Sequence, residues 1–263
     1  TTSTTGYTYS WSPGTGLNNT TISNPTLTLN NTGTTPTTAT YIVTTTLNGC
    51  ITSDTVVVTS APQPTANAGP DVFICSGQSI SIGTPGTTGY TYTWTPVTGL
   101  SNANSAVTNA TGTNTGTSPV NNTYIVNVNA FGCIDADTVT VQVRPNPVSQ
   151  AGPDVVLCGS DTLVLGTSST SGYTYSWSPA TNLSNTNTSN PTLIVSNNSA
   201  NPTSQTYVVT TTLNGCITTD SATITINPQP IILANAAPTS ICAGDTAQLV
   251  ATGATTYAWT WQS

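Results

Sequence analysis

The stretch GYTYTWTP, residues 89–96, alternates aromatic and hydroxyl side chains and then reaches a proline. Successive side chains of a β-strand point to opposite faces, so Tyr90, Tyr92 and Trp94 would share one face and the threonines the other. Proline lacks the N–H that a sheet needs and so marks the end of the strand. We therefore predict a half-buried strand whose aromatic face packs into a hydrophobic core.

Almost the same stretch occurs three times at a spacing of 83 residues, because GYTYSWSP begins at Gly6 and again at Gly172. Cysteines in NGC or FGC, tyrosines in TYIV or TYVV, and Pro-x-Pro segments keep the same spacing. Self-similarity at a fixed period marks a tandem array, and this period suits one small β domain per repeat. The predicted organisation is a partial repeat at 1–64, complete repeats at 65–147 and 148–230, and the N-terminal part of a further repeat at 231–263, all from a longer array.

Within a complete repeat, strand patterns alternate with turn-forming stretches. In residues 65–147 strands are predicted at 71–75, 79–83, 90–96, 121–130 and 137–143, and the linking stretches are rich in Gly, Pro, Ser and Thr. Seven or so short strands predict an all-β fold, a tandem array of antiparallel β-sandwich domains of Ig-like type. The predicted core aromatic residues are Trp11, Trp94, Trp177, Tyr41, Tyr124 and Tyr207, the tyrosines at a tyrosine-corner position.

The composition excludes several classes of function. The 263 residues contain one basic residue, Arg144, eight acidic residues and no histidine, for a net charge of −7. Without cationic groups a protein cannot neutralise nucleic-acid phosphates, and without histidine and lysine most catalytic constellations cannot be built. No apolar run is long enough to span a bilayer. We therefore expect no enzyme, no nucleic-acid partner, no membrane insertion and no cofactor.

Six cysteines without close spacing indicate disulfides and an oxidising compartment. Bonds within a repeat would be Cys75–Cys133 and Cys158–Cys216, with Cys50 and Cys242 left to partners elsewhere. However, a strand of seven residues holds the two cysteine loops of a sandwich roughly 23 Å apart, whereas a disulfide needs Cα atoms within about 7 Å. A bond between consecutive repeats, Cys75–Cys216, is therefore favoured. Pairing within repeats stays as the alternative, and free thiols or other pairings also remain open.

The aspartates suggest two further kinds of site. Asp135 and Asp137 in CIDADT could bind calcium together with backbone carbonyls, or could be solvated loop acids. Five aspartates precede a hydroxyl residue and then an aliphatic or alanine residue, either as turn residues that open a strand or as part of a modification motif. The candidate O-glycosylation residues are Thr55, Thr138, Thr162, Ser221 and Thr246.

The combination of AGPDVFIC at 68–75, YTWTP at 92–96 and NGC at 48–50 resembles the PKD/Ig-like repeats of giant Bacteroidota cell-surface proteins. These include SprB-type gliding-motility adhesins, and the Asp-hydroxyl motif is similar to the O-glycosylation acceptor of secreted proteins from the same bacteria. The resemblance implies type IX secretion and an extracellular, cell-surface location. The sequence departs from it at FGC in 131–133 and in the absence of GPD from 231–263.

We therefore expect a non-enzymatic structural or adhesive region that forms the stalk or filament of a surface adhesin, for gliding motility or attachment. Its partners would be neighbouring repeats and surface polysaccharide or substratum. The alternative is a carbohydrate-binding module array, which would need rows of exposed aromatic residues.

Overall fold

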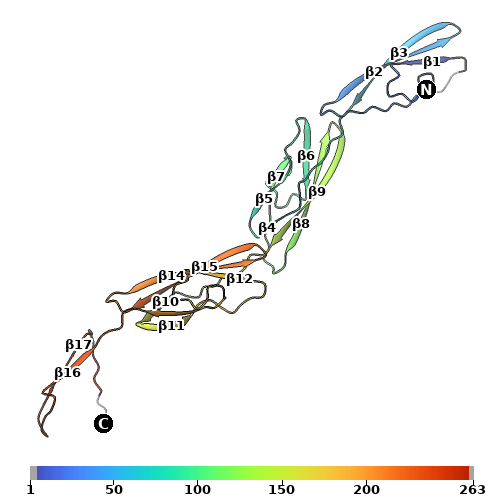
Figure 1. Cartoon of the computed structure of the whole chain (residues 1–263). Helices are drawn as coiled ribbons and strands as arrows, with labels where there is room; N and C mark the ends of the chain where they lie inside the picture. Colours follow the sequence, from blue (N-terminus) through green and yellow to red (C-terminus); the bar gives the residue numbers. More distant parts are fainter. Residues whose placement is uncertain (1–4, 261–263) are drawn as a thin grey trace. The chain divides into compact units, whose positions relative to one another are not determined.

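The computed structural model describes residues 5–260, and its named elements are 17 β-strands. The chain forms two compact units, Thr1–Pro145 and Asn146–Ser263. Each unit holds one two-sheet sandwich and one smaller sheet, which are found in Figure 1 by their strand labels. The all-β fold class predicted from the alternating patterns is confirmed.

The sandwich of the first unit occupies residues 72–144. Strands β4, β9, β8 and β6 form a four-stranded sheet in that order, and β5 and β7 form a two-stranded sheet. The sandwich therefore has six named strands where about seven were predicted. Their bounds are β4 Val72–Cys75, β5 Ser79–Gly83, β6 Tyr90–Thr95, β7 Val107–Thr111, β8 Val120–Ala130 and β9 Cys133–Arg144.

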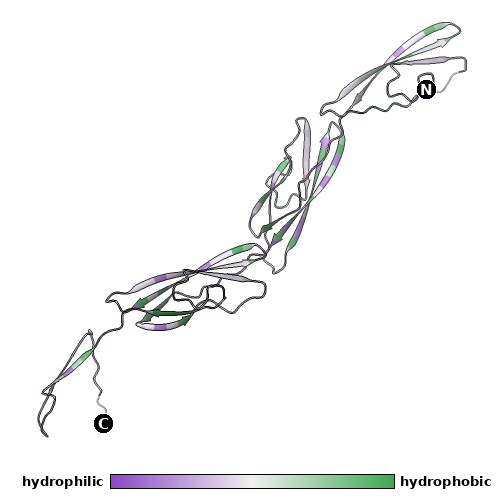
Figure 2. Cartoon of the chain, in the orientation of Figure 1, coloured by the Kyte–Doolittle hydropathy of each residue, from purple (hydrophilic) through white to green (hydrophobic). Residues whose placement is uncertain are grey.

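The core lies between these two sheets. Trp94 from β6 is fully buried, and the predicted inward row of β9, Val139, Val141 and Val143, is at most 1% exposed. Gly83, at the end of β5, has a positive φ of 89°, and a Cβ there would lie 2.9 Å from the Trp94 ring. Only glycine both adopts this conformation readily and lets the tryptophan pack so closely. Figure 2 shows the resulting alternation of hydropathy along the strands.

The second unit repeats this sandwich in residues 155–227. Its four-stranded sheet has the order β10-β15-β14-β12, its two-stranded sheet pairs β11 with β13, and Trp177 lies in the core. The strands are β10 Val155–Cys158, β11 Ser160–Val164, β12 Thr174–Ser178, β13 Thr192–Ser196, β14 Thr203–Leu213 and β15 Cys216–Asn227.

The first strand of each sandwich departs from the predicted antiparallel pattern. β4 pairs in parallel with β9, from Val72 opposite Val141 to Cys75 opposite Arg144, and β10 pairs in parallel with β15. The other strand pairs are antiparallel. Residue patterns locate a strand but do not reveal its neighbour, and so the parallel pair could not be read from the sequence.

The repeated NGC and FGC motifs are hairpin turns. In all three, both central residues have positive φ, which is the geometry of a type I′ turn and favours Asn-Gly. The departure in the second repeat is tolerated because Phe131, at φ 52°, packs its ring edge-on against Tyr90 with centroids 6.5 Å apart. The turn residues are Asn48 and Gly49, Phe131 and Gly132, and Asn214 and Gly215.

Residues 8–60 and 233–252 form single sheets. β1 (Thr8–Ser12), β2 (Thr37–Leu47) and β3 (Cys50–Ser60) make a three-stranded sheet, and β16 (Leu233–Ala237) pairs with β17 (Gln248–Thr252). No second sheet covers β1–β3 among the described residues, so Trp11 is only partly buried, unlike its equivalents in the sandwiches. The predicted core role of Trp11 is therefore only partly met.

An asparagine in the loop before β8 ties that loop to β9. The Nδ2 atom of Asn114 donates to the carbonyl oxygens of Ser118 and Val143, both at 2.8 Å, and its Oδ1 accepts from the Gly116 N–H. Asn31 and Asn197 make the same three kinds of bond in their repeats. Sequence analysis missed this residue, although its 83-residue spacing was a usable signal.

We expect Asn114→Ala to lower the free energy of unfolding of the first sandwich by about 1–3 kcal/mol, because two carbonyls and one N–H lose a partner at a largely buried position. Urea unfolding followed by NMR signals of residues 72–144 measures this loss. Asn109→Ala is the matched control, since Asn109 is exposed and its side chain makes no hydrogen bond within residues 5–260. Equal losses in the two variants would contradict the assigned role.

Candidate functional site

The segment that leads into the first sandwich is fixed to its last strand by two aspartates. The Oδ2 atom of Asp137 on β9 accepts a hydrogen bond of 2.8 Å from the Ala68 N–H. In the opposite direction, the Oδ1 atom of Asp71 accepts one of 2.7 Å from the Thr140 N–H on β9. We call this reciprocal pair of side chains the aspartate clamp. It joins the two ends of the repeat, which are 69 residues apart along the chain.

The second unit contains the same clamp. Asp220 on β15 accepts from the Ala151 N–H at 2.8 Å, and Asp154 accepts from the Thr223 N–H at 2.7 Å. The four clamp aspartates therefore follow the 83-residue period. They explain why AGPD recurs, since its alanine donates to one aspartate and its own aspartate reaches the last strand.

The clamp lies beside the parallel pair of first and last strands. Because the strands run in the same direction, the N-terminal end of β4 and the C-terminal end of β9 lie at opposite ends of their ladder. A pull on the two ends of the repeat therefore shears the ladder, and its hydrogen bonds are loaded together rather than one after another. The clamp bonds must break in the same event, which makes this region the candidate site of mechanical resistance.

Asp135, the other candidate calcium ligand, holds the segment before the clamp. Its Oδ2 atom accepts from the Ala66 N–H at 2.8 Å. In the second unit Thr218 takes its place, bonds the Ser149 hydroxyl and donates to the Pro147 carbonyl. Either residue thus supplies a side-chain partner to the segment that leads into the sandwich. Among residues 5–260 no group of three or more His, Cys, Asp or Glu could hold a metal ion.

Backbone hydrogen bonds lower the pKa of Asp137, one aspartate of the clamp. The N–H groups of Ala68 and Thr138 lower the pKa of the Asp137 carboxyl below its usual range, because they stabilise its charged form. Asp54, Asp137 and Asp220 lie within β3, β9 and β15, so the interpretation as turn residues that open a strand is wrong for these three.

The predicted aromatic residues make repeated hydrogen bonds. The Tyr124 hydroxyl donates to the Thr98 carbonyl 26 residues away, and Tyr41 and Tyr207 make the equivalent bonds. Each repeat tryptophan donates its indole N–H to a carbonyl 11 residues further on. Burial raises the pKa of the Tyr124 and Tyr207 hydroxyls. Tyr41, Tyr124 and Tyr207 are each 2% exposed, so these rings serve the core and present no face for a ligand.

The cysteines fall into two states. Cys75 and Cys216 are disulfide-bonded, and both are buried. The free thiols are those of Cys50, Cys133, Cys158 and Cys242. The alternative bonds within repeats, Cys75–Cys133 and Cys158–Cys216, are therefore not formed.

The five candidate glycosylation residues are all exposed. Four of the aspartates that precede these residues accept hydrogen bonds from backbone N–H groups. Asp137 and Asp220 do so in the clamp. Asp54 and Asp161 accept from the N–H groups of Thr55 and Thr162. The recurrence of the motif is thus partly explained by folding. The residues are Thr55, Thr138, Thr162, Ser221 and Thr246.

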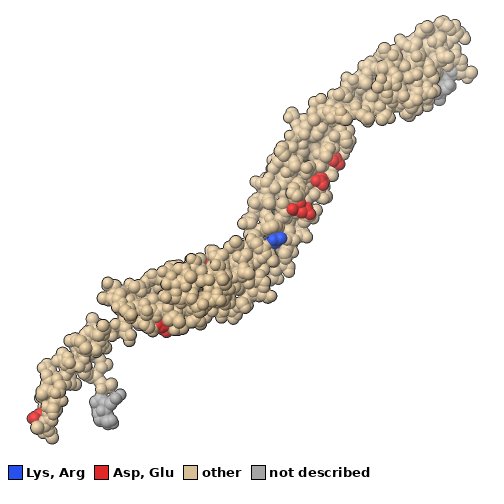
Figure 3. All heavy atoms as spheres, viewed as in Figure 1, with Lys and Arg blue, Asp and Glu red and all other residues tan. Residues whose placement is uncertain are grey.

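Charged side chains are sparse on the surface, as the red and blue atoms in Figure 3 show. The guanidinium carbon of Arg144 lies 3.6 Å from the centroid of the Phe73 ring, so the one cation covers an exposed aromatic residue of β4.

Within the described part of the chain, no helix has the length and apolar character needed to cross a membrane.

No family model and no curated protein matches the chain. Among solved structures, an I-band fragment from titin aligns with a TM-score of 0.44 and 13% identity, over 86% of this chain and 90% of that one. Extracellular domains 3–5 of Drosophila OTK align with a TM-score of 0.34 and 13% identity, over 72% and 70%. A SusE-like surface located polysaccharide binding protein from Bacteroides thetaiotaomicron aligns with a TM-score of 0.29 and 12% identity, over 60% and 33%. The sheets described above establish the Ig-like fold, and at this identity the likeness carries no functional information.

We expect the clamp to make stability depend on pH in the acid range. The folded pKa of Asp137 is lowered, so its contribution is fully present above the unfolded value of about 3.9 and is lost as the pH falls through the folded pKa. Chemical denaturation of the wild type and of Asp137→Asn, from pH about 7 down to about 2, should show a difference in stability that shrinks toward acid.

The matched control is Asp245→Asn, because Asp245 is exposed and lies outside both sandwiches. It should leave the unfolding of the first sandwich unchanged at every pH. A gap between wild type and Asp137→Asn that stays constant down to the lowest pH would contradict the contribution of the charged carboxylate.

Proposed function

We propose that these repeats form the mechanically resistant stalk of an extracellular structural or adhesive protein. The observation that carries this proposal is the parallel pairing of first and last strands with its aspartate clamp, which recurs in both units. A pull on the first and last strands of a sandwich loads this region in shear whenever no disulfide bypasses it. The near absence of charge supports the same role, since most of the side-chain contacts described here are neutral and insensitive to salt.

We further propose that Cys75 and Cys216 form one bond that joins consecutive repeats. These two cysteines are bonded while the other four have free thiols. Cys216 lies 141 positions after Cys75. No two of the other four cysteines have this spacing in the sequence. Structural disulfides persist in oxidising compartments, which supports an extracellular location.

A single-molecule pulling experiment on the oxidised chain tests both proposals. The bond would shield the 141 positions between Cys75 and Cys216 from extension. Reduction should therefore lengthen the fully extended chain by about 480 Å, at about 3.4 Å per residue. After reduction the sandwiches themselves carry the load, and the force needed to unfold each one should then fall in the clamp variants Asp137→Asn and Asp220→Asn.

Two controls separate the disulfide from the stalk. Cys75→Ser should extend fully without reductant, whereas Cys133→Ser should behave as the wild type because its thiol is free. Unfolding forces that the clamp variants leave unchanged would count against the stalk, and an extension that reductant does not alter would count against the bond.

Surface display, glycosylation and movement are part of the same proposal. Export to the cell surface by the type IX route, with glycans on the exposed hydroxyls of the Asp-hydroxyl motifs, would suit a gliding-motility adhesin or a static attachment filament. Fluorescent antibodies against residues 65–147 should label the surface of living source cells, with spots that travel if the protein drives motility. Peptide mass spectrometry of the native protein should find added mass on at least one of the five candidate residues. A lack of surface label would overturn the location.

A further inference from the structure

A cavity of about 260 Å³ opens beside the core of the first sandwich. It lies where the short sheet leaves part of the long hairpin uncovered: β5 and β7 have 5 residues each, whereas β8 has 11 and β9 has 12. Residues 33–34 and 63–67, which precede the sandwich, also line it. The short sheet covers only part of the long hairpin. The loop at residues 84–89 and the tyrosines of β6 border the remainder.

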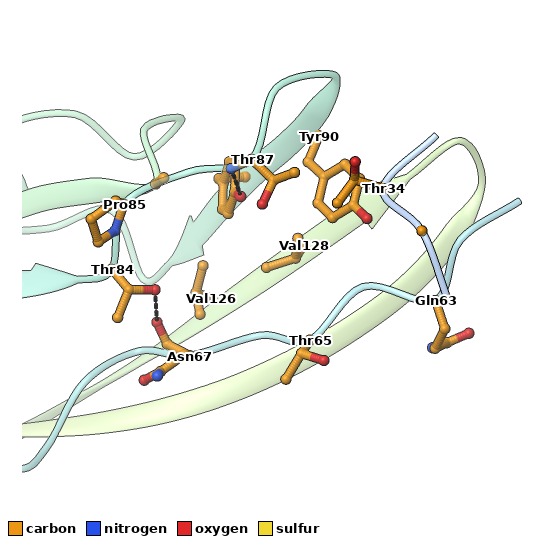
Figure 4. Close-up of a pocket in the computed structure, with 13 residues that line it drawn as sticks. Thr34, Gln63, Thr65, Asn67, Thr84, Pro85, Thr87, Tyr90, Val126 and Val128 are labelled. Atoms are coloured by element: carbon orange, nitrogen blue, oxygen red, sulfur yellow. Dashed lines mark hydrogen bonds between the residues drawn. The ribbon is translucent and has the colours of Figure 1, made fainter. Parts of the chain in front are cut away.

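The floor of this cavity is apolar and its walls are polar. Val126 and Val128 of β8 lie at the floor, and the walls include Thr65, Asn67 and Thr84 (Figure 4). The Thr84 hydroxyl donates to the Asn67 carbonyl at 3.3 Å. By contrast, no hydrogen bond within residues 5–260 uses the Thr65 hydroxyl or the Nδ2 atom of Asn67. The walls thus offer donors and acceptors to a bound molecule.

Two tyrosines complete the cavity. The Tyr92 hydroxyl accepts a hydrogen bond of 2.8 Å from the Thr87 N–H and so holds the loop in place. The Tyr90 ring lies beside Thr34 and Thr87 in Figure 4, and Phe131 packs against it at an interplanar angle of 89°, which fixes its orientation. Tyr90 is only partly buried, so its ring has accessible surface at the cavity.

We propose that this cavity binds one neutral sugar ring, such as a terminal residue of a glycan. Of the described residues that line it, none is charged, and a charged ligand would lose its hydration without gaining a counter-charge. Hydroxyl and amide groups around an apolar floor, with the accessible ring of Tyr90, suit a molecule with hydroxyl groups and apolar C–H faces. The volume is near the lower end of ligand pockets, about 300–1,000 Å³, and suits a single ring.

NMR titration of the full chain tests this proposal separately from the stalk, which does not depend on it. The probes are glucose, galactose, mannose and N-acetylglucosamine, each at a concentration on the order of 10 mM, above the millimolar Kd expected of a shallow site. At least one should shift the signals of Thr87, Val126 and Val128 in a saturable way. Glucuronate should cause smaller shifts, because it is charged.

Tyr90→Leu should weaken the binding about tenfold, since it removes the aromatic contact and keeps an apolar side chain. Tyr173→Leu is the matched control: it is the equivalent tyrosine 83 residues further on, in the other unit, and should leave the signals of the cavity and their Kd unchanged. No saturable shift with any neutral sugar, or an unchanged Kd in Tyr90→Leu, would overturn the proposal.

Discussion

The pairing of the first strand of each sandwich with its last strand is the constraint on which the repeat depends. It closes the four-stranded sheet at the edge where the chain enters, and it places the segment that leads into the sandwich alongside the strand by which the chain leaves. The aspartate clamp reinforces this pairing with charged acceptors, which form stronger hydrogen bonds than neutral ones. A force that enters a repeat through its first strand and leaves through its last strand is carried across this ladder.

The chain builds these sandwiches with very few charges. Short polar side chains supply the hydrogen bonds that loops and strand ends require, as Asn114, Asp71 and Asp137 show. Such side chains lose little rotamer entropy when they are fixed, compared with lysine or glutamate. Their bonds to backbone groups are short in space, although the partners of the two aspartates lie 69 residues away along the chain. This composition supports the structural role proposed above.

The two sandwiches share a framework but differ at the surface. Asp135 in one corresponds to Thr218 in the other, and both hold the segment before the clamp. Phe131 corresponds to Asn214, and Phe131 packs edge-on against Tyr90 of β6. The framework positions recur because folding needs them, whereas the surface positions can vary and can acquire binding properties in one repeat alone.

The sequence by itself determined the repeat and the strand pattern. Period-2 alternation fixed which residues of β6 and β9 face the core, because a strand can present only two faces, and the 83-residue spacing identified equivalent positions. The tertiary structure decided which strands pair and which distant residues meet. The contact of Asp137 with Ala68 spans 69 residues, and no local pattern encodes the partner of a side chain so far along the chain. The parallel first strand, the clamp and the cavity therefore arise only when the two sheets close around their core.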